Sequence, residues 1–151
     1  MEKLHFEIEI KASPEQVYQT FMHPEHYRDW TSAFNPISYY RGTWAVGSTM
    51  YFLGEDEQGQ VGGMISEIRA NEPNAFISLA HIGILHNGEE ITSGEDVDSW
   101  KGSLEDYRFS PQEGGTLLQV AQDSLTPMTP GLQNTWNKAL QRLKAICEGK
   151  G

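Results

Sequence analysis

The sequence has one cysteine, few basic residues and no long apolar run, and each shortage excludes a class of protein. The single Cys147 cannot form a disulfide within the chain, which favours a reducing compartment. Eleven Lys and Arg against 21 Asp and Glu give a formal charge of −10, which argues against nucleic acid or an anionic membrane surface as partner. No run approaches the roughly 18 apolar residues of a membrane helix, and the N-terminus has no signal-peptide core. We therefore expect a soluble, cytoplasmic protein without membrane insertion.

Motifs for covalent catalysis, nucleotides or metals are also lacking. The sequence contains no Gly-x-Ser-x-Gly elbow, dinucleotide fingerprint or phosphate loop. The segment 88–106 holds seven carboxylates without calcium-loop spacing, and we interpret it as a solvated acidic loop or, alternatively, a docking site for a basic partner. His81 and His86 are five apart on an expected strand, so they should face opposite sides unless a bulge intervenes. We predict no cofactor and no metal.

The first thirty residues carry the clearest local signals. Apolar and polar residues alternate over 4–11, the pattern of a half-buried strand. Ser13 and Pro14 predict a helix start, with Gln16 completing a capping box. A second proline after His23 starts another helix that runs to Trp30.

Strand signals separated by glycines dominate the middle of the chain. Gly114 and Gly115 mark a hairpin turn, and a polar loop is expected over 86–98. Six further strands are expected after the first: Ile37–Arg41, Ser48–Leu53, Gln60–Arg69, Phe76–Leu85, Trp100–Phe109 and Leu117–Asp123.

A long amphipathic helix is predicted at the C-terminus. Thr129 and Pro130 mark its start and Gly149 its end. The following apolar residues share one helical face: Leu132, Trp136, Ala139, Leu140, Leu143, Ile146 and Cys147. This face needs a hydrophobic partner, and the sheet is the large one available. We predict one α+β domain over 1–148 and a disordered tail over 149–151, with a curved antiparallel sheet of about seven strands around the last helix. One helix cannot fill a wide concave sheet, so we expect a cavity between them.

The order of these segments resembles the Bet v 1/START-like superfamily, in the branch called SRPBCC and the group named after the activator of Hsp90 ATPase. The matching segments extend over the whole chain: Ser13–Tyr18, Pro24–Trp30, Gly47–Phe52, Ile65–Ile68 leading to Pro73, Gly114–Leu118, and Trp136, Leu140 and Leu143 in the last helix. The resemblance implies a helix-grip fold.

The resemblance also implies three functions. Members of the superfamily bind small hydrophobic molecules in the cavity, a minority catalyse cyclisation, dehydration or hydrolysis there, and Hsp90 activators use the domain to bind a chaperone. We expect the first, with a chaperone-binding module or a cyclase- or hydrolase-like enzyme as alternatives, because fold alone does not assign chemistry.

Two polar residues are candidate ligand anchors. Alternation places Glu105 on the same strand face as Tyr107 and Phe109, so Glu105 should point into the cavity with a pKa raised by desolvation. A hydrated Glu105 at the cavity mouth, or paired with Arg108 or Lys101, is the alternative. His81 lies in a strand that is apolar on both faces, where a histidine usually bonds a carbonyl or hydroxyl, and contact with a ligand is the less common outcome.

The remaining candidates are aromatic or apolar, and core packing would also explain them. The predicted ligand-binding set is completed by Trp30, Tyr51, Trp100, Tyr107, Phe109, Trp136 and Leu140. The strand containing His81 could also be covered on its outer face by a second copy of the chain, which predicts a possible homodimer.

Overall fold

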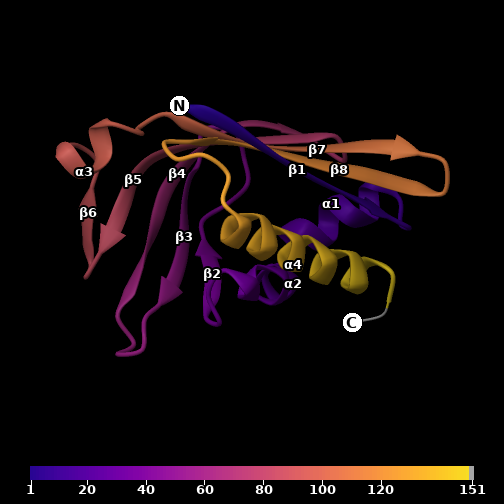
Figure 1. Cartoon of the computed structure of the whole chain (residues 1–151), viewed down its shortest axis with the longest axis horizontal. Helices are drawn as coiled ribbons and strands as arrows, with labels where there is room; N and C mark the ends of the chain where they lie inside the picture. Colours follow the sequence, from indigo (N-terminus) through magenta and orange to yellow (C-terminus); the bar gives the residue numbers. More distant parts are fainter. Residues whose placement is uncertain (150–151) are drawn as a thin grey trace.

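An eight-stranded antiparallel sheet curves around one long helix in the computed structural model, which describes residues 1–149 (Figure 1). The strands are β1 (Glu2–Ile10), β2 (Ser38–Arg41), β3 (Thr49–Glu55), β4 (Val61–Glu72), β5 (Phe76–His86), β6 (Glu89–Ile91), β7 (Ser103–Gln112) and β8 (Gly115–Ser124). The helices are α1 (Pro14–Met22), α2 (Pro24–Trp30), the 3-10 turn η1 (Thr31–Ala33), α3 (Glu95–Asp98) and α4 (Pro130–Cys147). The predicted helix-grip fold is confirmed.

Seven strands form a continuous path in the order β1-β8-β7-β5-β4-β3-β2, and β6 pairs with β5 beside it. Every pairing is antiparallel, and most join strands that are neighbours in the sequence through hairpins. The predicted hairpin at Gly114 connects β7 to β8, where Gln112 pairs with Gly115. About seven strands were expected, and the additional one is the three-residue β6.

The segment expected as a polar loop, 86–98, is more regular than predicted. Asn87 and Gly88 both have positive φ, 49° and 82°, and form the two-residue turn between β5 and β6. Asn-Gly is the sequence that favours such a turn, so the signal was present in the sequence. The helix α3 follows, and Trp100 lies in the turn after it, where its indole N–H donates to the Asp96 carbonyl at 2.7 Å. The expected strand start at Trp100 is therefore wrong, and β7 begins at Ser103.

The helix starts follow the predicted capping residues. The Ser13 hydroxyl accepts from the Gln16 N–H at 3.2 Å, and Thr129 accepts from the Leu132 N–H at 3.1 Å. The predicted capping box is half wrong, because the Gln16 side chain does not return to Ser13. It donates to the Cys147 carbonyl at 3.0 Å and so joins α1 to the end of α4. A contact over 131 residues cannot be read from local spacing.

The helix α4 lies against β1 and the short helices (Figure 1), and most of the predicted face is buried, with Leu132 and Ile146 half-buried. Trp136, Ala139, Leu140, Leu143 and Cys147 are buried, and the helix ends before Gly149, whose φ of 76° suits glycine. Of the predicted tail 149–151, residues 150–151 lie outside the described residues. Of the helices within 1–149, none is long and apolar enough to cross a membrane.

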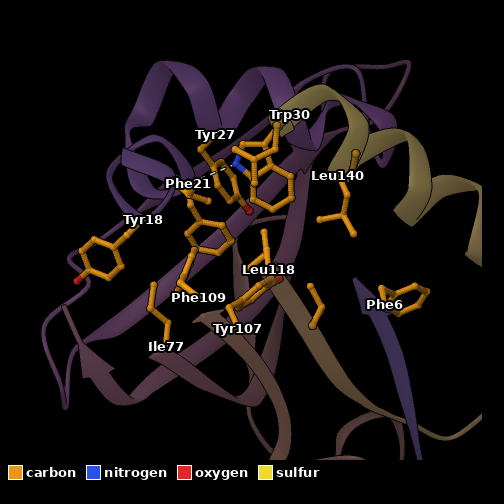
Figure 2. Close-up of a cluster of buried hydrophobic side chains, with 14 of the residues drawn as sticks. Phe6, Tyr18, Phe21, Tyr27, Trp30, Ile77, Tyr107, Phe109, Leu118 and Leu140 are labelled. Atoms are coloured by element: carbon orange, nitrogen blue, oxygen red, sulfur yellow. Dashed lines mark hydrogen bonds between the residues drawn. The ribbon is translucent and has the colours of Figure 1, made fainter. Parts of the chain in front are cut away.

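Aromatic side chains fill the space between the helices and β7 (Figure 2). The ring of Phe21 from α1 is central: its centroid lies 4.6 Å from that of Tyr107, 5.2 Å from that of Trp30 and 5.6 Å from that of Phe109. The Trp30 indole N–H donates to the Phe21 carbonyl at 3.2 Å. This cluster fixes α1 and α2 over one half of the concave sheet and leaves the other half open.

Candidate functional site

A cavity of about 930 Å³ occupies the open half of the concave face. Its wall is built from β3, β4, β5, β7 and β8 on the sheet side and from α2 and the first turns of α4 on the helix side. Phe34 and Leu125, which are 43% and 55% exposed, belong to both this wall and the protein surface. The expected space between the sheet and the last helix is thus present.

A β-bulge determines which side chains of β5 face the cavity. Ser66 of β4 pairs with His81, but the preceding Ile65 pairs with Gly83, so Ile82 is an extra residue in β5. The extra residue reverses the alternation of faces beyond it. His81 and His86 consequently both line the cavity, although they are five residues apart.

A chain of polar contacts lies on the cavity wall formed by β4, β5 and β7. The Tyr107 hydroxyl donates to Glu105 Oε2, and His81 Nε2 lies 3.3 Å from Glu105 Oε1. His81 Nδ1 lies 2.7 Å from the hydroxyl of the fully buried Ser66. If Ser66 donates to Nδ1, the Nε2–H of a neutral imidazole can donate to Glu105. The side chain of Glu105 is 15% exposed, and that of His81 is 11% exposed.

These contacts reverse the expected ionisation of Glu105. Burial raises its pKa, but its contacts with His81 and Tyr107 lower it more, so the pKa lies below its ordinary value of 4.5. The predicted upward shift is wrong because it considered burial alone. Burial and the neighbouring Glu105 charge raise the pKa of Tyr107 and of Tyr27, so both phenols stay protonated.

The cluster can therefore present a carboxylate inside a largely apolar cavity. An ionised Glu105 can accept a hydrogen bond or a proton from a bound molecule, but it cannot act as a general acid at neutral pH. Within residues 1–149, no group of three or more His, Cys, Asp or Glu side chains is arranged to hold a metal ion.

Six of the predicted site residues lie on the cavity wall: Trp30, His81, Trp100, Glu105, Tyr107 and Trp136. Phe109 and Leu140 are packed in the core outside the wall. Tyr51 also lies off the wall, with the Arg41 guanidinium 4.6 Å from its ring centroid. That these residues bind a ligand stays a prediction.

Some wall residues were missed from the sequence. Phe21 and Tyr27 lie on the apolar faces of two short helices and had no feature that distinguished cavity from core. Gln122 lies on β8, where its side-chain carbonyl accepts from the Trp136 indole at 3.2 Å. Its position on the inner face of β8 was the available signal, because a polar side chain there needs a partner.

The charge of Glu105 should make stability depend on pH. We expect Glu105→Gln to lower the free energy of unfolding by about 1 kcal/mol at pH 7, because hydrogen bonds to a charged group are the stronger ones. Because folding lowers the pKa of Glu105, the stabilisation by its charge is fully present above the pKa that Glu105 has in the unfolded chain. This stabilisation is lost as the pH falls through the lower pKa of the folded protein. Urea unfolding of both proteins between pH 7 and pH 3 measures this. If the difference in unfolding free energy between the two proteins grows toward acid pH, the lowered pKa of Glu105 is contradicted.

Comparisons with known proteins agree with this architecture. The family described as "Activator of Hsp90 ATPase homolog 1-like protein" matches residues 11–148. Among solved structures, the Aha1 dimer from Colwellia psychrerythraea is 23% identical with a TM-score of 0.70, and the match covers 100% of both chains. An AHSA1-like protein from Aeromonas hydrophila is 20% identical with a TM-score of 0.71, over 99% of this chain and 96% of that one.

A protein from Rhodobacter sphaeroides is 18% identical with a TM-score of 0.73, over 99% of this chain and 93% of that one. These identities are low, so the three structures show a shared fold. No curated protein matches the sequence significantly. The family match covers most of the chain, and with the helix-grip architecture it leads to one conclusion: the chain belongs to the activator of Hsp90 ATPase homolog 1-like family, within the SRPBCC superfamily.

Proposed function

We propose that this protein binds a small hydrophobic or amphipathic molecule in the cavity between the curved sheet and α4. The observation that carries the proposal is the cavity itself, because about 930 Å³ lies within the usual range of small-molecule sites. Its family shares a fold that commonly holds ligands.

The distribution of polar groups supports an oriented ligand. Glu105, His81 and Tyr107 form one connected cluster on the sheet side. Trp30 and Trp136 contribute apolar surface from the helix side. A molecule with one polar end and an apolar body can satisfy both sides at once.

Native mass spectrometry of freshly purified protein, compared with the denatured mass, tests the proposal. We expect an excess mass of a few hundred daltons that is lost on denaturation. A bare native mass would not by itself exclude a weak ligand, so tryptophan emission provides the second readout. All four tryptophans of the chain, Trp30, Trp44, Trp100 and Trp136, line the cavity. A bare mass together with emission that no apolar probe alters would contradict the proposal.

Two further predictions accompany this function. The relative from Colwellia psychrerythraea is described as a dimer, and we propose that this chain can also form a homodimer, whose mass the same native spectrum would reveal. A cytoplasmic location stays a prediction from composition.

The family name supports a second candidate, a chaperone-binding module of the Hsp90-activator type. That function predicts a higher ATPase rate when the protein is added to an Hsp90. An unchanged rate at saturating protein would count against it.

A further inference from the structure

The cavity wall is rich in aromatic rings and carboxylates, and among the described residues it contains no lysine or arginine. Nine aromatic side chains line it. Its five carboxylates are Glu55, Asp56, Asp96, Glu105 and Asp123. A chain with 21 acidic and 11 basic residues favours acidic surfaces in general, but a described wall without lysine or arginine restricts what can bind there.

The five carboxylates differ in how deeply they are buried and in whether a neighbouring group compensates their charge. Asp123 is paired with Lys3 at 2.8 Å, and its other oxygen accepts from the Leu104 N–H at 2.9 Å, so its charge is largely compensated. Asp56 and Asp96 are exposed. Glu105 differs from Asp56, Asp96 and Asp123, because it is largely buried and its partners are two side chains of the wall, His81 and Tyr107.

Glu105 also retains capacity to accept. Its two oxygens provide about four lone-pair sites, and His81 and Tyr107 each use one. The contacts of His81, with Ser66 donating to Nδ1 and Nε2–H donating to Glu105, are those of a neutral imidazole, and with them the cluster carries a net negative charge against the cavity. The rings of Tyr27, Tyr107 and Trp136 line the same space, and the faces of such rings attract cations as well as apolar groups.

We propose that the ligand is a cationic amphiphile, with a protonated or quaternary amine next to Glu105 and an apolar body against the aromatic wall. The inference rests on the proposed function and specifies its ligand class. A fatty-acid-like anion would find no lysine or arginine on the described wall to pair with and would meet the Glu105 charge. The overall charge of −10 further raises the local concentration of cations around the protein.

Three matched probes test the ligand class: octylamine, 1-octanol and octanoate. They share the same chain and differ in the charge of the head group at pH 7.5. Titration followed by tryptophan emission, with calorimetry as a second readout, gives the three affinities at about 0.15 M salt. We expect octylamine to bind roughly tenfold more tightly than octanol, which is the effect of one favourable charged contact, and octanoate to bind most weakly.

Two variants assign the preference to Glu105. Glu105→Gln removes the charge, while its amide oxygen can accept from Tyr107 and its amide nitrogen can donate to the other tautomer of His81. We expect this variant to lose about tenfold in octylamine affinity and to bind octanol as before. Asp106→Asn is the matched control, because Asp106 is the next residue of β7, lies off the wall and accepts from Ser78 at 2.5 Å. It should not change either affinity.

The possible outcomes separately test the ligand class, the role of Glu105 and the proposed function of the cavity. Equal affinities for the three probes, or a preference for octanoate, would overturn the cationic ligand class and leave the cavity function standing. An equal loss of octanol and octylamine affinity in Glu105→Gln would show that Glu105 supports the wall structurally, and this would also overturn the inference. If none of the probes binds by either readout, the ligand class is overturned, and a bare native mass in addition would contradict the proposed function as well.

Discussion

Phe109→Ala should lower the free energy of unfolding by about 3–5 kcal/mol, a large share of the total stability of a domain of this size. Phe109 is 2% exposed and packs edge-on against Phe21 and Tyr18, with centroids 5.6 and 5.7 Å away. The residue lies off the cavity wall, so truncation would leave a new void among packed rings. Such voids are costly because the surrounding structure relaxes only in part.

Phe34→Ala is the matched control, since it removes the same atoms from a residue that is 43% exposed. Its ring contacts Trp136 at 4.9 Å between centroids, and we expect a cost below about 1 kcal/mol. Urea unfolding followed by far-ultraviolet circular dichroism should show a midpoint lower by about 1.5–2.5 M for Phe109→Ala, at a slope of about 2 kcal/mol/M. Equal midpoints for the two variants would show that Phe109 is not a central core residue.

Gly63→Ala should also be strongly destabilising, by about 3 kcal/mol or more. A Cβ at Gly63 would lie 1.9 Å from the Phe52 carbonyl oxygen and 2.9 Å from the Leu53 Cα, both on the backbone of β3. Backbone atoms of a paired strand cannot move as a flexible side chain can. The substitution must therefore separate β3 from β4, and these strands form one wall of the cavity.

The neighbouring Gly62 provides the control within the same strand. A Cβ there would lie 3.3 Å from the Leu85 carbonyl oxygen, a tight contact that a small shift can relieve. We expect Gly62→Ala to change the free energy of unfolding by less than about 1 kcal/mol. Thermal unfolding of the two variants side by side compares them, and similar melting temperatures would mean that the close approach of β3 and β4 at Gly63 is easily relaxed.

The candidate site shows where the alternation of side chains along a strand predicts the cavity-facing residues and where it fails. In β7 the alternation is regular, and it correctly placed Glu105 on the same face as Tyr107. In β5 the same rule fails after Ile82, because the bulge brings His86 to the face of His81. The bulge is visible in the pairing of β5 with β4. Its one signal in the sequence is the isolated Gly83 beside it, which is compatible with a bulge but does not show which strand holds the extra residue.

By itself the sequence determined the order of the longer elements, without β6 and α3, the capping residues at Ser13 and Thr129, and most of the buried face of α4. These features depend on residues a few positions apart, where turn chemistry and periodicity act directly. Tertiary structure alone decided the size of the cavity, the β5 bulge and the ionisation of Glu105. The pKa of Glu105 depends on a hydrogen bond from His81, 24 residues away on the neighbouring strand, as well as on burial. Burial and hydrogen bonding shift this pKa in opposite directions, and the distances between side chains on neighbouring strands decide which effect is larger. Local sequence patterns do not contain those distances.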